Sequence, residues 1–119
     1  MGDDNKRLGR LGEDLAAAHL VRRGLRVLER NWRCRLGELD IVAADGSCLV
    51  VCEVKTRSGT SHGSGAEAVT PVKVARLRKL GAAWLSERRL RVGQVRIDVV
   101  SVSLHRSGEA TIDHITGVE

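Results

Sequence analysis

Two apolar segments joined by Asp45-Gly46 constrain the fold of this chain more than any other feature of its sequence. Residues 37–44 and 48–56 both have the composition of β-strands. An Asp-Gly pair between two such segments is among the strongest local signals for a tight hairpin turn. The sequence therefore predicts an antiparallel hairpin whose second strand ends in Glu53-Val54-Lys55.

The register of this hairpin decides which polar side chains come together. With a two-residue loop at Asp45-Gly46, Asp40 is expected opposite Val51, and Glu38 opposite Glu53. Asp40 and Glu53 then become diagonal neighbours, about 7–8 Å apart at the backbone. A four-residue loop would keep them on one face, whereas a loop one residue longer or shorter would separate them. The polar side chains expected on this face are Glu38, Asp40, Glu53 and Lys55.

Asp40 and Glu53 are candidate ligands for a divalent cation. Mg²⁺ takes oxygen ligands and commonly uses one or two protein carboxylates, which leaves positions for water and substrate phosphate. Lys55 could orient an attacking water or stabilise a developing oxyanion. This combination predicts phosphodiester hydrolysis. The alternative is an ordinary cluster of charges on a solvated strand edge, which would explain Glu53 and Lys55 without any metal.

The spacing of these residues resembles the PD-(D/E)XK nuclease superfamily, because Asp40 is followed thirteen positions later by Glu53-Val54-Lys55. The chain is more closely similar to the YraN family, which comprises small bacterial proteins that are predicted endonucleases and are similar to archaeal Holliday-junction resolvases. This similarity runs over nearly the whole chain. It rests on Gly12-Glu13, Asn31, Gly37-Glu38-Leu39-Asp40, Glu53-Val54-Lys55-Thr56-Arg57, Lys73 and Arg96-Ile97-Asp98.

The resemblance implies a restriction-endonuclease-like core with a four-part site. Asp40 and Glu53 would bind Mg²⁺, for which Mn²⁺ could substitute, and Lys55 would be the catalytic lysine. Glu13 would reach in from the first helix. Cys52 departs from the family pattern, which usually has a bulky apolar or aromatic residue there. Because cysteine is itself a small buried hydrophobe, this departure affects core packing more than chemistry.

The first helix is expected over about residues 5–23, ending at Gly24. Its apolar stripe consists of Leu8, Leu11, Leu15 and Ala18. Glu13 lies off that stripe beside Gly9, Gly12 and Ala16, whose small size would let the helix approach the sheet closely. The alternative is that Glu13 faces solvent, like most helical carboxylates.

The remaining elements complete a single α/β domain over residues 1–119. A second helix is expected from Thr70-Pro71 to about Arg88, with Thr70 as N-cap. Strands are expected at about 25–30, 37–44, 48–56, 95–102 and 110–115. We therefore expect a mixed, largely antiparallel central sheet flanked by the two helices. Residues 57–66 are rich in Gly and Ser and are expected to form a mobile loop beside the site, in which His62 receives no role.

The basic composition favours nucleic acid as a partner. The net charge is +5, the isoelectric point is about 9.7, and no apolar segment is long enough to span a bilayer. Trp32 and Trp84 are the only aromatic side chains, and both are expected in the core. Recognition by backbone charge and shape therefore fits better than base stacking. The resemblance to resolvases implies DNA in preference to RNA. The candidate nucleic-acid-binding residues are Arg33, Arg35, Arg57 and Lys73, although a solvated helix face could explain several basic residues.

Several other polar residues receive structural interpretations. Arg96 and Asp98 share a strand face and are expected to form a structural ion pair. Adjacent Asp113 and His114 point to opposite faces, and neither His19 nor His105 belongs to a recognisable constellation.

The sequence leaves assembly and catalytic competence open. Cys34, Cys48 and Cys52 lack the spacing of zinc or redox motifs, which predicts reduced thiols in a cytoplasmic protein. A homodimer would suit a twofold DNA junction. A non-catalytic nucleic-acid-binding module that keeps the nuclease fold is the alternative to an enzyme.

Overall fold

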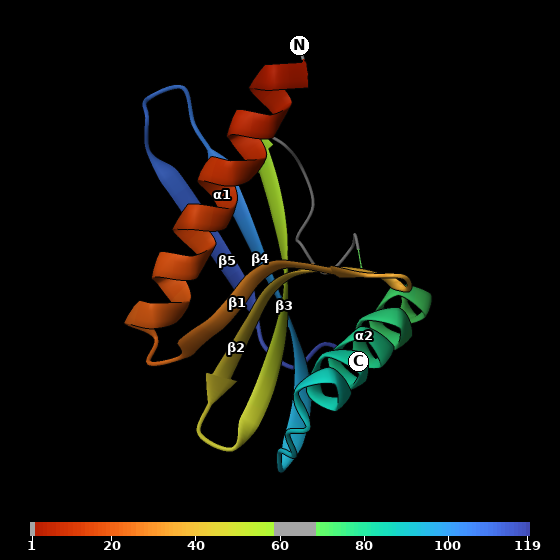
Figure 1. The fold of residues 1–119 in the computed structure, drawn as a ribbon. Coiled ribbons are helices and arrows are strands. Elements are labelled where there is room, and N and C mark those ends of the chain that lie inside the picture. Colours follow the sequence, from red (N-terminus) through yellow and green to blue (C-terminus); the bar gives the residue numbers. More distant parts are fainter. Residues whose placement is uncertain (1, 59–68) are drawn as a thin grey trace.

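One sheet of five strands lies between two helices (Figure 1). The computed structural model describes residues 2–58 and 69–119, with side chains described from Asn5 onwards. The elements are α1 (Gly2–Arg22), β1 (Arg26–Cys34), β2 (Gly37–Asp45), β3 (Cys48–Ser58), α2 (Pro71–Arg88), β4 (Gln94–Leu104) and β5 (Ala110–Ile115). The expected helices and strands are all present. The first strand is predicted to end at about residue 30, but β1 continues to Cys34.

The strands follow chain order across the sheet, from β1 to β5. The pairs β1–β2, β2–β3 and β4–β5 are antiparallel, and β3–β4 is parallel. A parallel pair needs a crossover connection, and α2 lies in the segment between β3 and β4. The mixed, largely antiparallel sheet of the prediction is confirmed, and the architecture is consistent with a restriction-endonuclease-like fold.

The first helix lies very close to the third strand because of a glycine. A Cβ built on Gly12 would come within 1.9 Å of Thr56 Oγ1 on β3, so any larger residue would push α1 away from the sheet. Ala16 and Leu20, one and two turns further along, are fully buried in the cluster that includes Cys52 of β3. The expected close approach of α1 is therefore confirmed. The helix ends before Gly24, whose φ of 90° is a conformation that glycine adopts without strain.

The second helix covers the other face of the sheet. Thr70 caps it by accepting a hydrogen bond from the Lys73 backbone N–H at 3.2 Å, and Pro71 is its first residue. Its buried apolar side chains, including Trp84, belong to a second apolar cluster that also contains Trp32 of β1, which confirms both tryptophans as core residues. Neither helix in the described ranges is both long enough and apolar enough to cross a membrane.

The hairpin between β2 and β3 has a different register from the predicted one. Asp45 pairs with Cys48, so the two-residue loop is Gly46-Ser47 rather than Asp45-Gly46. Asp45 is therefore the last residue of the strand, and all pairings shift by two residues. Because a shift by two preserves which side chains share a face, the carboxylates stay close despite the error. Glu38 does not pair with Glu53, because the pairing of β2 with β3 ends at Ile41, and Glu38 pairs with Arg33 of β1.

Candidate functional site

The sheet divides at Asp40. The last pair between β2 and β3 is Ile41 with Cys52, after which β2 continues to pair with β1 and β3 continues to pair with β4. Asp40 Oδ2 accepts the Val54 backbone N–H at 2.9 Å, so a carboxylate takes the place of a strand partner. Figure 1 shows β1 and β2 turning away from β3 towards the first turn of α2. This divergence opens space around one carboxylate in the middle of the sheet.

Glu53 follows Cys52, the last residue of β3 that pairs with β2. Its side chain faces the N-terminal turn of α2. Its Oε2 lies 2.8 Å from Lys73 Nζ, and its side chain is only 12% exposed. Glu53 also interacts with the carboxyl of Asp40, and Lys55 interacts with Lys73. Two carboxylates and two ammonium groups from three elements therefore form one interacting cluster. We call Asp40, Glu53, Lys55 and Lys73 the central cluster.

The two carboxyl groups of the central cluster are held in different protonation states. Burial, a hydrogen bond with Glu53 and the negative charges of Glu53 and Glu13 raise the pKa of Asp40 to about 7. Burial alone would raise the pKa of Glu53, but the hydrogen bond with Asp40 and the ion pair with Lys73 outweigh it, so that pKa is lowered. The pair therefore holds one proton at mildly acidic pH and loses it as pH rises through the Asp40 pKa of about 7.

The lysines of the central cluster also have opposite shifts. Burial and the adjacent Lys73 ammonium lower the pKa of Lys55, despite the carboxylates nearby. The ion pair with Glu53 raises the pKa of Lys73. Lys73 therefore neutralises Glu53 directly, whereas Lys55 is a partly desolvated cation at the edge of the cluster.

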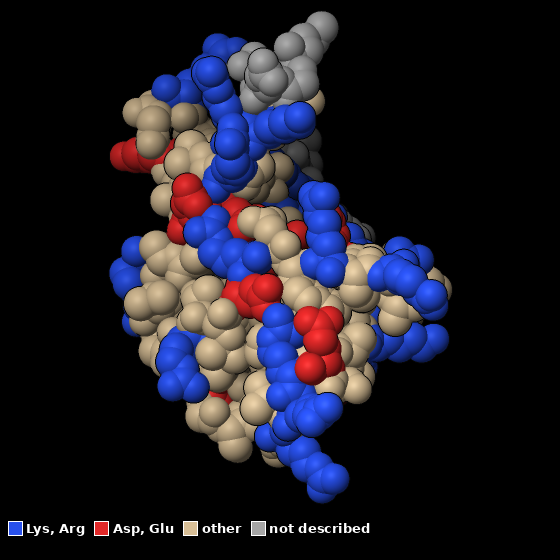
Figure 2. Space-filling view, viewed as in Figure 1, with Lys and Arg blue, Asp and Glu red and all other residues tan. Residues whose placement is uncertain are grey.

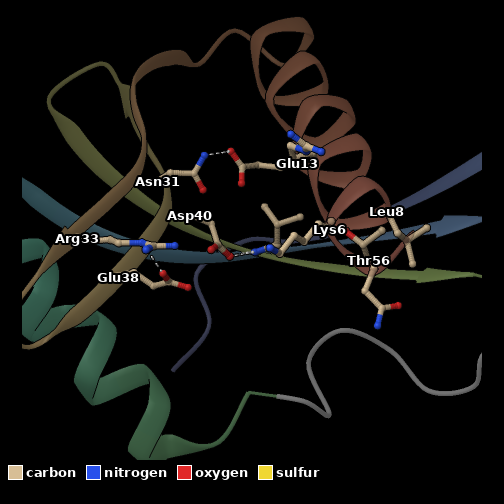
Figure 3. Close-up of a pocket in the computed structure, with 12 residues that line it drawn as sticks. Lys6, Leu8, Glu13, Asn31, Arg33, Glu38, Asp40 and Thr56 are labelled. Carbon is tan, nitrogen blue, oxygen red and sulfur yellow. Dashed lines mark hydrogen bonds and ion pairs between the residues drawn. The ribbon is translucent and has the colours of Figure 1, made fainter. Parts of the chain in front are cut away.

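Glu13 reaches the site from α1 and lines the same groove as Asp40 (Figure 3). It is 9% exposed, and its Oε1 accepts hydrogen bonds from Arg30 Nε at 2.8 Å and Asn31 Nδ2 at 3.0 Å. Asn31 has a φ of 54°, which an asparagine tolerates better than most residues. Glu13 is therefore buried as the resemblance implied, and it is not the solvent-facing carboxylate of the alternative interpretation.

An open groove of about 620 Å³ runs between α1 and the β1–β2 hairpin. Glu13, Asn31 and Asp40 line it, and Figure 3 shows these side chains converging from α1, β1 and β2. Its basic lining residues are Lys6, Arg10 and Arg33. The groove thus joins the buried carboxylates to a basic surface.

The remaining predicted site residues lie around this centre. Arg33 is exposed and forms an ion pair with Glu38 at 3.1 Å, and Arg35 is exposed in the turn between β1 and β2. Arg57 lies near the end of β3, paired with Ser103 of β4. Most of the expected loop over residues 57–66, including His62, lies outside the described residues.

The donor set suits a hard divalent cation. Within residues 2–58 and 69–119, no group of three or more His, Cys, Asp or Glu side chains could hold a metal ion. Two carboxylates alone are what Mg²⁺ or Mn²⁺ commonly takes from a protein when phosphate and water complete the coordination. A divalent cation between Asp40 and Glu53 could replace the proton that their carboxyl groups hold at mildly acidic pH. Cys52 is buried, and burial raises the pKa of its thiol, which makes it a poor ligand.

A second polar cluster lies on the α1 face and was missed by sequence reasoning. The expected ion pair is confirmed, because Arg96 Nε donates to Asp98 Oδ1 at 2.9 Å. However, His114 also bonds Asp98 at 2.9 Å and His19 at 3.1 Å, so the interpretation of His19 as isolated is wrong. The two contacts of His114 join residues that are 16 and 95 positions apart in the sequence. No short sequence pattern could therefore predict them. We call Asp98, Arg96, His114 and His19 the histidine cluster.

Comparison with known proteins supports the resemblance noted in the sequence. The model of the uncharacterised protein family UPF0102 matches residues 12–102. A UPF0102 protein of Frankia casuarinae is 56% identical over 110 residues, covering 92% of this chain and 93% of that protein. Similar proteins from Nocardioides sp. and Kineococcus radiotolerans are each 52% identical, over 111 and 112 residues, and cover 93% of this chain and 90% and 92% of their own lengths. The chain therefore belongs to the UPF0102 (YraN) family.

Proposed function

We propose that this protein is a metal-dependent nuclease that hydrolyses phosphodiester bonds, and that it acts as a structure-selective DNA endonuclease of the Holliday-junction resolvase type. The observation that carries the proposal is the proximity of Asp40 and Glu53, two half-buried carboxyl groups on neighbouring strands, to each other and to Lys55 and Lys73. Such a pair is costly in a protein without a ligand, and like-charged carboxyl groups in a cleft are typical of functional sites.

Asp40 and Glu53 would hold Mg²⁺ or Mn²⁺, which would supply charge neutralisation at the scissile phosphate. Lys55 would donate hydrogen bonds to an attacking water or to a phosphate oxygen as negative charge develops. Lys73, which already neutralises Glu53, would release that carboxylate when the cation binds and would then contact the phosphate backbone. Glu13, fixed by Arg30 and Asn31, would add negative charge on the groove side of Asp40.

The charge of the surface around the groove supports a nucleic-acid substrate. In Figure 2, Lys and Arg side chains are frequent over α1 and α2, with Asp and Glu side chains between these two regions. Lys6, Arg10 and Arg33 line the groove that leads to Asp40. Backbone phosphates would contact such residues without base recognition, which favours an enzyme that selects DNA by shape.

The direct test is cleavage of labelled four-way junction, flap and duplex DNA with Mg²⁺ or Mn²⁺. We expect cutting of branched DNA by the wild type and its loss in Glu53→Gln. Glu87→Gln is the matched control, because Glu87 is an exposed carboxylate at the far end of α2. Absence of cleavage by the wild type, or equal cleavage by Glu53→Gln, would contradict the proposal.

Metal binding and chemistry can be separated by a second pair of variants. Asp40→Asn should lose both Mn²⁺ binding in calorimetry and turnover. Lys55→Met should lose turnover and keep Mn²⁺ binding, because its proposed role begins only when the substrate is present. A Lys55→Met protein that fails to bind Mn²⁺ would refute the division of roles.

The alternative function is a nucleic-acid-binding module without turnover. The ion pair of Lys73 with Glu53 at 2.8 Å favours it, since an ammonium group already occupies the place of a cation. That alternative predicts DNA binding in EDTA, no calorimetric signal with Mn²⁺, and no effect of Asp40→Asn on affinity. Mn²⁺ binding that depends on Asp40 would exclude it.

A further inference from the structure

The turn between β1 and β2 has an unusual composition for its position. Cys34 pairs with Gly37, so Arg35 and Leu36 form a two-residue turn. Gly, Asn and Asp dominate such turns because of their backbone and hydrogen-bonding properties, whereas leucine offers neither. Leu36 is nevertheless 60% exposed at the end of the hairpin. No local backbone requirement explains an apolar side chain here.

Leu36 is part of a larger apolar surface. A hollow of about 430 Å³ lies between the turn and α2, and Leu36, Val72 and Ala75 line it together with Arg76 and Lys79. Val72 is 70% exposed, the highest value among the large hydrophobic residues described as exposed. We call these five residues the tip patch. It combines apolar side chains with basic ones and has no acidic lining residue among those described.

The tip patch is rigidly connected to the central cluster on both of its sides. On the hairpin, Leu36 precedes Asp40 by four residues of β2. On α2, Val72 directly precedes Lys73, which holds Glu53. The hairpin end also rests on α2, because a Cβ on Gly37 would lie 3.4 Å from Leu80. A ligand on the tip patch would therefore be held at a fixed distance from the proposed metal site.

We propose that the tip patch binds unpaired or unstacked bases at the branch point of a DNA substrate, with Leu36 inserted against the end of a base stack. This inference rests on the proposed function and names the feature of the substrate that the site would select. Apolar wedges between base steps are a general means of kinking DNA, and phosphates on either side would contact Arg35, Arg76 and Lys79.

The charge of the tip patch distinguishes DNA from a second copy of this chain. Two copies meeting at this surface would bring Arg76 and Lys79 of each chain together without acidic partners from the lining residues. Such like-charge contact disfavours association in water. An unstacked base next to anionic phosphates offers an apolar face to Leu36 and Val72 and negative charge to Arg76 and Lys79.

The spacing along β2 predicts where the cut falls. Four residues of extended strand span about 13 Å, and successive phosphates of one strand of duplex DNA are about 3.4 Å apart along the helix axis. For a duplex arm whose axis runs along β2, the scissile phosphate should therefore lie on the order of four nucleotides from the branch point.

The test measures base unstacking in EDTA, so that it does not depend on cleavage. Four-way junction DNA carries 2-aminopurine at the branch point, and a linear duplex carries it at the same position in the strand. We expect a fluorescence increase on binding of the wild type to the junction only. Leu36→Ser should abolish most of that increase and bind the junction about tenfold more weakly, whereas Leu36→Met should restore both. Leu90→Ser is the matched control, since Leu90 is 50% exposed and lies beyond the C-terminal end of α2.

Each result decides the proposal. An equal increase with Leu36→Ser, or an equal loss with Leu90→Ser, would overturn it. A dimer of the wild type in sedimentation velocity that Leu36→Ser abolishes would also overturn it, by assigning the surface to a second copy. The proposed nuclease activity can fail separately. Base unstacking without any cleavage would refute only the nuclease activity. Cleavage and unstacking that are unchanged in Leu36→Ser would refute only the role of the tip patch.

Discussion

Asp40 and Asp98 are both carboxylates within the sheet, and their surroundings differ in almost every respect. Asp98 is fully buried and accepts hydrogen bonds from Arg96, His114 and the Gly117 backbone N–H at 2.9–3.0 Å. These donors outweigh burial and lower its pKa. Asp40 accepts the Val54 N–H but lies beside the carboxyl of Glu53, and its pKa is raised to about 7.

The difference distinguishes a group that stabilises the fold from one suited to binding. The hydrogen bonds of Asp98 are supplied by the protein itself, and the carboxylate joins β4 to β5 and to the C-terminal segment. The ionised form of Asp40 is unfavourable in the folded protein, so a cation that binds it would recover that free energy. Local electrostatic conflict of this kind is tolerated where it serves function.

The largest expected effect is on turnover. Asp40→Asn should reduce DNA cleavage by more than about 1000-fold, because it removes a proposed metal ligand, whereas Asp98→Asn should stay within a few-fold of the wild type. Initial rates with Mn²⁺ at a temperature where both variants are folded provide the measurement. Similar losses in the two variants would end the distinction between a binding and a structural carboxylate.

The second prediction concerns the histidine cluster. Asp98→Ala should destabilise the protein by about 3–5 kcal/mol in urea denaturation, because it removes the acceptor shared by Arg96, His114 and the Gly117 N–H and leaves Arg96 only its contact with the more exposed Asp45. Since the pKa of Asp98 is lowered in the folded state, its contribution is present above about pH 4 and is lost as pH falls through the folded pKa. The free energy of unfolding of Asp98→Ala should therefore fall less than that of the wild type as pH is lowered below about 4. Asp113→Ala, an exposed neighbour, should change stability by less than about 0.5 kcal/mol.

The third prediction tests the approach of α1 that brings Glu13 near Asp40. Gly12→Ala should destabilise the protein by about 1–3 kcal/mol, because its Cβ would overlap Thr56. Gly9→Ala, one turn earlier and with open space around it, should instead stabilise by about 0.5–1 kcal/mol. Thermal or urea unfolding of both variants provides the comparison. Equal effects would mean that α1 does not lie tightly against β3.

The smallest expected effect is a gain in stability. Because the pKa of Asp40 is raised in the folded state, its ionisation should lower stability as pH rises from about 4 to 7. Asp40→Asn keeps an oxygen acceptor without the charge, so it should stabilise the protein by about 1–2 kcal/mol at pH 8 and by much less at pH 5. Urea denaturation in EDTA at both pH values measures this. A loss of stability at pH 8 would place Asp40 in the same category as Asp98.

The sequence predicted the fold better than the contacts of the site. Strand and helix patterns depend on residues near one another, and they identified all seven elements of the described chain. The proximity of Asp40 and Glu53 was predicted although the turn was misplaced by one residue, since alternation along a strand survives a two-residue shift. The ion pair of Lys73 with Glu53 could not be predicted, because it depends on how the first turn of α2 lies against β3.

The division of the sheet at Asp40 has a consequence for the entropy of binding. Asp40 and Glu53 lie on central strands that the fold already orders, and Lys73 lies in a capped helix. A cation would therefore meet donors whose backbones are fixed before it arrives, so little conformational freedom would be lost on association. Within the described residues, the central cluster takes its groups from regular strands and a helix, so the order of the fold is also the order of the site.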